Sequence, residues 1–482
     1  MKRIISLLLG IVLMFTSVYT ASAADVSEKK WLKMWGDYDE NIAPAVTMFV
    51  GSDESERYIA WYSETAEGYV ELKGVKGTEK IEAQSKASAD GGYRLYAVLK
   101  GLTDGEYSYT CYSGDFISEE YSFTVEDTDE FTALFVTDIH MAKEEDNKNS
   151  LEERSYIYNK TLSAAEEMAE ERGGSLDLIV SAGDQASEGL TDELIALSSP
   201  ELMKTVPFAP SVGNHDRKSV GYKAYTALPN ENDVTFRSYI GTDYWYRYGD
   251  VLFLMFDSCN TSMRAHHKFA KEATKANEDA VWIVAAMHHD MFGGREPWLN
   301  TENTLLRFLW MPLFDRYGID ICLYGHSHYY SASNIIFKNE TTVSLAETEL
   351  LTDAEGTLYL SGGSVNNFAP LLDDEGNVPP VGENAAFTYL EEEEPLYTLL
   401  DFSESFLEIN SYTVDDGENF FSLTLEKSDK NGGHEYKKAN IFRLGLTYFV
   451  SRIVNVINNS DMYKRYKNQG YDVSLFEGLI GS

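Results

Sequence analysis

The sequence contains few cysteines, few prolines and few basic residues for its length. Its 482 residues include 3 cysteines and 11 prolines. Because Cys111, Cys259 and Cys322 are spaced far apart, they exclude a disulfide framework and a cysteine-rich zinc site. Stability must therefore come from apolar cores, in which we expect Cys259 and Cys322 to be small buried side chains. The low proline content and the lack of a long repeat exclude a fibrous or disordered protein.

Positive charge is also scarce. The chain has 40 Lys and Arg against 78 Asp and Glu, and its formal net charge is −38. Such a chain repels nucleic-acid backbones and anionic membranes, so we expect no binding of a nucleic-acid duplex. Solubility is the simplest reason for this charge. A site that processes phosphate then needs local positive charge of its own.

The N-terminal stretch MKRIISLLLGIVLMFTSVYTASA is typical of a secretory signal peptide over residues 1–23. Lys2 and Arg3 precede an apolar run, and Ala21-Ser22-Ala23 offers small residues for cleavage. An uncleaved membrane anchor is the alternative, but the apolar run is short for a span. We therefore expect a protein that is secreted or located in the cell envelope.

The rest of the chain divides into regions of different composition. Residues 25–127 alternate short Tyr- and Val-rich runs with turn signals such as Asp90-Gly91-Gly92, which predicts an all-β sandwich without catalytic groups. Residues 131–412 combine apolar runs with helical stretches at 150–172 and 191–205, which predicts sheets covered by helices.

Residues 413–482 form a C-terminal extension that we expect to be helical from about Tyr436. This end is strongly apolar, but Arg443 and Arg452 interrupt it. A helix packed on the protein is therefore favoured over one that spans a membrane. Membrane contact by this helix is the alternative.

Chemically active side chains follow the predicted strands of the second region. These strands are 131–136, 176–183, 206–213, 251–257, 280–287 and 318–325. Ligands of such folds gather beyond the carboxyl ends of the strands. Six of the nine histidines fall at these ends, within the motifs FVTDIH, VSAGD, SVGNHD, AAMHHD and LYGHSH.

Each motif alone has an ordinary explanation. Asp138-Ile139-His140 could be a capped turn, Gly183-Asp184 a turn pair, and His288-His289 part of the core or the surface. Together they predict a metal site, because imidazole and carboxylate suit Zn, Fe or Mn. Two such ions about 3.5–4 Å apart can share a carboxylate and a hydroxide, lower the pKa of bound water to about 7 and neutralise a phosphoryl group.

The ordered set D-x-H, G-D, G-N-H-D, H-H and G-H-x-H resembles the calcineurin-like metallophosphoesterase superfamily. The resemblance covers residues 131–412, and the upstream sandwich is similar to the arrangement of purple acid phosphatases. It implies an α/β (α+β) fold of four layers, in which two facing sheets are flanked by helices, after an all-β domain of the fibronectin or Ig type. It also implies a metal-dependent phosphoric ester hydrolase with two divalent or trivalent ions, Mn, Zn or Fe.

The resemblance also implies roles for single residues. It places Asp138, His140 and His328 on the first metal ion, Asn214, His288 and His326 on the second, and Asp184 between the two. His215 contacts the phosphoryl group and protonates or stabilises the leaving oxygen, and Asp216 orients His215. We expect Gly213 to allow a tight turn. Apart from the resemblance, we expect further substrate contacts or pocket walls, mainly in the segments after the strands, at Asn214, His289, Arg217, Arg295, Tyr222, Arg264, Phe292 and Trp298. The alternative is a surface role for the arginines and a supporting role for His289.

Two positions depart from the purple acid phosphatases. Ser187 stands where those enzymes have a tyrosine, and His140 stands where they have a glycine. We therefore expect no purple charge-transfer band and no obligate Fe(III).

The expected activity is hydrolysis of a phosphomonoester by direct attack of a metal-bound hydroxide. A phosphodiesterase or nucleotidase on the same site is the alternative within this chemistry. A surface binding protein with a vestigial site is the alternative outside it. The motifs leave open the natural ester, the metals and the oligomeric state.

Overall fold

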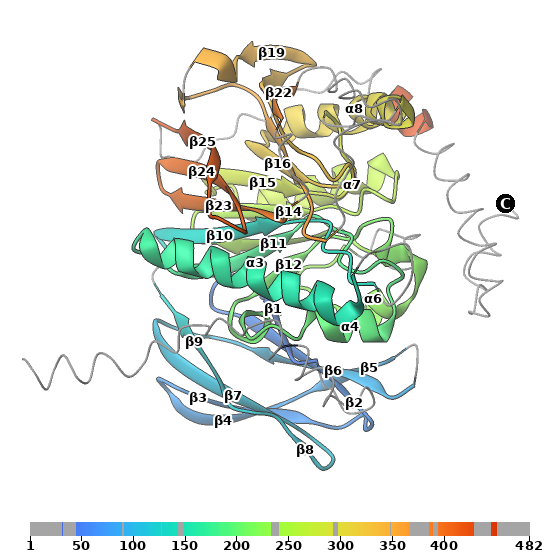
Figure 1. The fold of residues 1–482 in the computed structure, drawn as a ribbon, viewed down its shortest axis with the longest axis vertical. Helices are drawn as coiled ribbons and strands as arrows, with labels where there is room; N and C mark the ends of the chain where they lie inside the picture. The colour runs from blue at the N-terminus through green and yellow to red at the C-terminus, as the bar shows by residue number, and fades with distance from the viewer. Residues whose placement is uncertain are drawn as a thin grey trace, which may run out of the picture.

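Two stacked β-sandwiches make up the described part of the protein in this computed structural model (Figure 1). The structure describes residues 31, 45–88, 91–126, 128–142, 149–232, 241–292, 297–347, 349–366, 385–388, 394–428 and 445–450. The predicted signal peptide and most of the C-terminal extension lie outside these residues.

The N-terminal sandwich consists of two antiparallel layers. One layer contains β1 (Thr47–Val50), β2 (Arg57–Ser63), β5 (Gln84–Ala87) and β6 (Tyr93–Leu99). The other contains β3 (Tyr69–Gly74), β4 (Gly77–Glu82), β7 (Gly105–Ser113), β8 (Phe116–Ile117) and β9 (Tyr121–Val125). In β9, burial alternates with exposure, so that Tyr121, Phe123 and Val125 face the core between the layers. The predicted all-β sandwich is confirmed.

The larger sandwich has two mixed sheets that face each other. The first contains β10 (Glu130–Val136), β11 (Leu176–Ser181), β12 (Phe208–Pro210), β20 (Leu350–Thr352), β23 (Leu396–Ser403), β24 (Phe406–Thr413) and β25 (Asn419–Glu426). The second contains β13 (Tyr244–Tyr248), β14 (Val251–Met255), β15 (Trp282–Ala286), β16 (Ile321–Tyr324), β17 (Tyr330–Ser333), β21 (Leu358–Gly362) and β22 (Ala385–Thr388), and a hairpin lies beside it, β18 (Ile335–Phe337) and β19 (Glu340–Val343).

Strand β14 shows why the predicted strands are apolar without alternation. Phe253 faces the core between the two sheets, whereas Leu252 and Leu254 face a second core under the outer helices. A strand that is buried on both faces needs apolar residues at every position. The predicted four-layer fold is confirmed.

Helices cover both outer faces. They are α3 (Leu151–Glu171), α4 (Thr191–Leu197), α5 (Leu202–Thr205), α6 (Gly221–Tyr225), α7 (Met263–Ala276) and α8 (Pro297–Tyr317), with 3₁₀ turns η1 (Asp216–Lys218) and η2 (Leu345–Glu347). The predicted helix at 150–172 is confirmed: Ser150 and Glu153 form a capping box at its start. The single helix predicted at 191–205 is wrong, because it is divided into α4 and α5 around Pro200.

One sheet runs through both sandwiches. Strand β1 pairs in parallel with β12, with Phe49 opposite Phe208, so eleven strands join in the order β20-β25-β24-β23-β10-β11-β12-β1-β2-β6-β5. The division of the chain into 25–127 and 131–412 stays a prediction. The hydrogen bonds between β1 and β12, within this one sheet, cross the boundary between the two regions.

Residues 445–450 are helical, and the Tyr448 ring lies 5.7 Å from the His267 ring on α7. The remainder of the predicted C-terminal helix lies outside the described residues. Within the described part of the chain, no helix combines the length and apolar character needed to cross a bilayer. Cys111, Cys259 and Cys322 are all buried and free, which confirms the predicted burial of Cys259 and Cys322.

Candidate functional site

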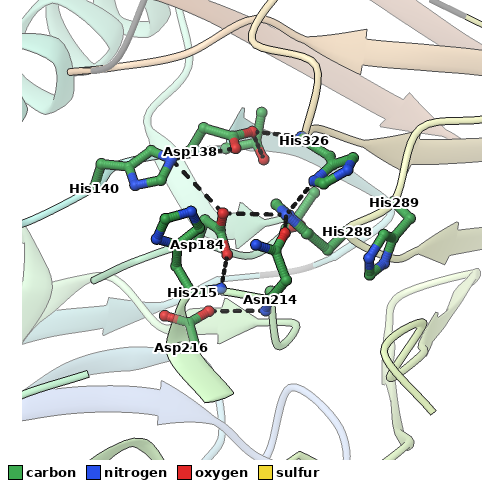
Figure 2. Close-up of polar contacts among 12 residues, drawn as sticks. Asp138, His140, Asp184, Asn214, His215, Asp216, His288, His289 and His326 are labelled. Atoms are coloured by element: carbon green, nitrogen blue, oxygen red, sulfur yellow. Dashed lines mark hydrogen bonds and ion pairs between the residues drawn. The ribbon is translucent and has the colours of Figure 1, made fainter. Parts of the chain in front are cut away.

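The loops after β10, β11, β12, β15 and β16 bring their polar side chains together at one edge of the facing sheets (Figure 2). Parallel strands place their carboxyl ends at the same edge, which explains this convergence. The residues that meet there are Asp138, His140, Asp184, Asn214, His215, His288, His326 and His328.

Five of these residues have left-handed backbone conformations. The φ angles are 51° at Asp138, 49° at His140, 53° at Asp184, 71° at His326 and 59° at His328. Residues other than glycine rarely adopt this region, at a cost of about 1–3 kcal/mol each, and such strain concentrates at functional sites. The fold therefore holds these side chains in positions that the local chain does not favour.

Asp138, His140 and His328 form one side of the site. The Nε2 atoms of His140 and His328 lie 3.1 Å apart, and His328 Nε2 lies 3.2 Å from Asp138 Oδ1. Asp138 and His140 are buried, and the side chain of His328 is 19 % exposed. Three ligand atoms thus face one point that is open on the His328 side.

Asp184 lies between this group and a second one (Figure 2). Its Oδ2 is 3.7 Å from His140 Nε2 and 3.2 Å from His288 Nε2. His288 Nε2 is in turn 2.9 Å from Asn214 Oδ1 and 3.3 Å from His326 Nδ1. One carboxylate oxygen therefore faces both groups of nitrogen ligands.

Hydrogen bonds from outside the two groups orient their side chains. Asp138 Oδ2 accepts from Thr137 Oγ1 at 2.8 Å and from the backbone N–H of His326 at 2.9 Å, so its Oδ1 faces the site. His288 Nδ1 lies 3.0 Å from the Ala182 carbonyl oxygen, which leaves Nε2 for the site. Such partners fix the tautomer and the direction of metal-binding side chains.

Ser187, which was predicted to stand where purple acid phosphatases have a tyrosine, contacts two histidines. Its Oγ lies 3.2 Å from His140 Nδ1, and its carbonyl oxygen lies 3.0 Å from His215 Nδ1. The rings of His140 and His215 meet edge to face with centroids 4.8 Å apart. Ser187 therefore orients two histidines. His140 belongs to the group with Asp138 and His328, and His215 lies beside that group.

The electrostatics of the site favour positive charge between the carboxylates. Burial alone lowers the pKa of His288, but the Asp184 carboxylate raises it to about 9. Burial raises the pKa of Asp184, but His288 and His140 outweigh burial, and this pKa lies below its ordinary value. For His140 burial prevails, and its pKa falls to about 4. A cation in place of the proton on His288 would be attracted to the Asp184 carboxylate in the same way.

Two glycines of the motifs make room for carboxylates. A Cβ on Gly213 would lie 2.1 Å from Asp184 Oδ1, and a Cβ on Gly325 would lie 2.0 Å from Asp138 Oδ2. Gly213 is therefore required by a close contact, and the tight turn expected there stays a prediction. Any side chain there would push Asp184 out of position.

The predicted role of Asp216 is wrong. Its carboxylate does not contact His215 but accepts hydrogen bonds from the backbone N–H of Gly213 at 2.8 Å and of Ala186 at 3.1 Å. Burial raises the pKa of Asp216 well above its ordinary value, and Asp184 adds to this effect. Asp216 thus ties the loop after β12 to the loop after β11, and the partner of His215 is the Ser187 carbonyl group.

The other predicted substrate contacts have mixed outcomes. His289 lies at the outer side of His288, with its Nδ1 2.8 Å from Ser258 Oγ (Figure 2). Arg217 donates from Nη1 to the Cys259 carbonyl oxygen at 2.9 Å. Arg264 is exposed on α7, and Arg295 and the side chain of Trp298 lie outside the described residues.

Tyr222 and Phe292 pack into the protein beside the site, although Tyr222 also lines a small pocket with Pro210 and Val212. Both are buried, with 2 % and 1 % of their surface exposed. Tyr222 donates to the Ser211 carbonyl oxygen at 3.1 Å, and the Phe292 ring lies 4.7 Å from the Tyr359 ring in the outer core. Their position after strands predicted proximity to the site but not the direction of the side chain.

Sequence reasoning missed several supporting residues. Ser258 accepts from the backbone N–H groups of His288 at 3.2 Å and His289 at 3.1 Å. Arg154 on α3 is buried and donates to the His140 carbonyl oxygen at 2.7 Å. The sequence offered no signal for Arg154, because it shows an arginine in the predicted helix but not the burial that forces this cation to find acceptors.

The donor set fits a pair of metal ions. Three sets of ligand atoms lie within 4.8 Å of one another: Asp138 with His140 and His328, His140 with Asp184 and His215, and Asp138 with Asp184 and His288. Imidazole nitrogens and carboxylate oxygens are ligands for Zn, Mn and Fe. His215 is in one of these sets, so its position beside the site is compatible with metal contact as well as substrate contact.

Comparisons with known proteins agree with this chemistry. The calcineurin-like phosphoesterase family matches residues 131–330. Two uncharacterized proteins of Mycobacterium tuberculosis, from strains CDC 1551 and H37Rv, are each 24 % identical over 193 residues. These matches cover 34 % of the chain and 36 % of each relative, so the chain spans about a third of the length of the curated relatives it matches.

Two solved structures share the fold. A purple acid phosphatase from yellow lupin seeds has a TM-score of 0.60 and 17 % identity, and the match covers 80 % of this chain and 75 % of that one. A structure of PhoD has a TM-score of 0.52 and 12 % identity, with 86 % and 98 % covered. Residues 131–330 therefore match the calcineurin-like phosphoesterase family, and the chain shares its fold with these two structures.

Proposed function

We propose that the chain hydrolyses phosphomonoesters at a site that holds two divalent or trivalent metal ions. Asp138, His140 and His328 hold one ion, and Asn214, His288 and His326 hold the other. The position of Asp184 Oδ2, 3.7 Å from His140 Nε2 and 3.2 Å from His288 Nε2, is the observation that carries this proposal. When bound, such ions supply a hydroxide nucleophile at neutral pH and neutralise the phosphoryl oxygens.

The substrate approaches from the partly exposed side of the site. Asp138, Asp184 and His288 are buried and form its floor, whereas Asn214 and His215 are only partly buried. His328 is 19 % exposed in its side chain and lies at the same rim. A phosphoryl group that enters here meets His215 without displacing the buried carboxylates.

His215 then assists the leaving group. Its Nδ1 donates to the Ser187 carbonyl oxygen, so Nε2 is the atom that faces other groups. Burial lowers the pKa of His215, and Asp184 partly offsets this effect. A bound phosphate dianion adds negative charge nearby and favours the protonated imidazole, which can give its Nε2 proton to the departing oxygen.

Turnover of two chromogenic esters tests this function. Metal-free protein is loaded separately with Mn, Zn and Fe, its metal content is measured, and p-nitrophenyl phosphate and bis-p-nitrophenyl phosphate are assayed. We expect faster hydrolysis of the monoester, with Asp184→Asn inactive. Faster hydrolysis of the diester would replace the phosphomonoesterase proposal with a phosphodiesterase. A protein that binds two ions but hydrolyses neither ester would be a binding protein.

We also propose that the protein acts outside the cytoplasm, because of the Lys2-Arg3 start and the apolar run that follows. Fractionation of expressing cells tests this proposal. Recovery of the full-length chain in the cytoplasm would overturn it.

A further inference from the structure

Arg94 joins the N-terminal sandwich to the segment that follows the proposed catalytic loop. It lies on β6 and is fully buried. Its Nη1 donates to the Ala45 carbonyl oxygen at 2.7 Å, and its Nη2 donates to Thr47 Oγ1 at 3.2 Å. Its Nε crosses to the other sandwich and donates to the Tyr225 carbonyl oxygen at 3.2 Å.

Two aromatic rings enclose the same guanidinium group. Its centre lies 4.5 Å from the Tyr62 ring and 4.7 Å from the Tyr225 ring. Arginine combines fixed donors with a flat face that stacks on rings, and lysine offers neither. Burial lowers the pKa of Arg94, which reflects the cost of keeping this charge away from water. The contacts with Tyr225 therefore offset part of the free-energy cost of burying the Arg94 charge.

Further polar contacts cross the same boundary. Ser198 Oγ, at the end of α4, lies 2.9 Å from Thr47 Oγ1 and 3.0 Å from Tyr225 Oη. Lys86 on β5 donates to the Thr226 carbonyl oxygen at 2.8 Å. The last residue of α6 and the residue after it are therefore both held by the N-terminal sandwich.

Helix α6 also holds the loop that carries Asn214 and His215. Tyr222 on this helix is buried, and its Oη donates to the Ser211 carbonyl oxygen at 3.1 Å. Ser211 is the first residue after β12. A continuous set of contacts thus runs from Arg94 through α6 to the start of this loop.

We propose that Arg94 is a positioning residue for the loop of residues 211–215, so that the N-terminal sandwich forms part of the catalytic unit. The expected effect on kcat rests on the proposed function, whereas the expected effect on the structure of the loop does not. The pairing of β1 with β12 gives the sandwich a second contact with the strand that leads into the same loop. Arg94 acts on the loop through α6, without contacting the substrate.

Replacement of Arg94 by methionine tests the proposal against a matched control. Leu72→Ala serves as the control because Leu72 is buried in the core of the same sandwich, on β3 of the opposite layer. Both variants lower the melting temperature. We expect Arg94→Met to lower kcat at saturating metal by at least about tenfold with KM within about threefold, because small misplacements of catalytic groups cost this much. Leu72→Ala should leave kcat within about twofold.

Hydrogen exchange of the metal-free protein provides a readout that needs no activity. The backbone N–H groups of Gly213 and His215 donate to Asp216 and Asp184. Arg94→Met should speed exchange in the peptide around 211–218, whereas Leu72→Ala should not. Unchanged exchange in both variants would overturn the inference. A protein without turnover but with faster exchange in Arg94→Met would overturn the proposed function alone.

A double-mutant cycle with Tyr222→Phe tests the route through α6. Contacts that act in series give losses that do not add. We therefore expect Arg94→Met with Tyr222→Phe to lose no more kcat than the more severe single variant, and additive losses would contradict the route. If Arg94→Met does not fold, Thr47→Val replaces it in both experiments, because this change removes the Oγ1 that accepts from Arg94 and contacts Ser198 across the same boundary. Unchanged exchange at 211–218 in Thr47→Val would then overturn the inference.

Discussion

The backbone N–H of His215 donates to Asp184 Oδ1 at 2.7 Å. This bond joins the loop after β12 to the loop after β11, and the Asp216 carboxylate joins the same loops in the reverse direction through the backbone N–H of Ala186. This hydrogen bond requires the two loops to approach each other closely. Gly213, two residues before His215, is where that approach leaves no space for a side chain.

Gly213→Ala should therefore disrupt the site. The new Cβ would lie 2.1 Å from Asp184 Oδ1, so Asp184 or the loop must move. We expect a loss of about 1–3 kcal/mol of unfolding free energy and loss of metal binding. Gly174→Ala is the control, because its Cβ would be 3.7 Å from the nearest atom. Full metal content in Gly213→Ala would contradict the contact.

His215→Ala separates substrate contact from metal binding. If His215 gives a proton to the leaving oxygen, kcat should fall by about 10²–10⁴-fold while both ions remain bound. Metal content and turnover of p-nitrophenyl phosphate are measured on the same preparation. Loss of an ion in this variant would instead make His215 a ligand, as its proximity to His140 and Asp184 permits.

Ser187→Ala tests the support of His140. The change removes the Oγ that lies 3.2 Å from His140 Nδ1 but keeps the carbonyl oxygen that His215 contacts. We expect metal affinity to fall by about 10–100-fold, as for other partners of metal-bound histidines. Calorimetric titration with Zn²⁺ measures this change. The iron-loaded unaltered protein should also lack a visible charge-transfer band, because Ser187 offers no phenolate.

Asp177, which lies away from the candidate site, should make the stability of the protein depend on pH. Burial raises its pKa to about 7, although the backbone N–H of Thr132 donates to it at 2.9 Å. Between pH 4 and 7 the folded protein keeps this proton and the unfolded chain has lost it, so stability falls as pH rises. Asp177→Asn should thus gain about 1–2 kcal/mol relative to the unaltered protein between pH 5 and 8. A difference that does not vary with pH would contradict this.

The sequence predicted the strands that are buried on both faces and the side chains at their ends. The apolar run of β14 and the histidines after β15 and β16 are local patterns, and local patterns can be recognised without knowing the fold. Helix α8 escaped prediction because Pro312 lies inside it. The pairing of β1 with β12 joins residues about 160 positions apart, and no local pattern encodes it.

Contacts between loops were also beyond prediction. The pattern G-N-H-D suggested that Asp216 serves its neighbour His215, whereas its carboxylate bonds to the backbone of another loop. Tyr222 was expected to face the pocket, but its hydroxyl group supports Ser211. Both errors concern the direction of a side chain, which depends on packing between distant segments.

Anomalous diffraction from a crystal grown with Mn²⁺ or Zn²⁺ tests the central claim most directly. We predict two ions, one against Asp138, His140 and His328 and one against Asn214, His288 and His326, both in contact with the Asp184 carboxylate. A single ion at Asp184, or an Asp184 carboxylate that touches none, would contradict the account.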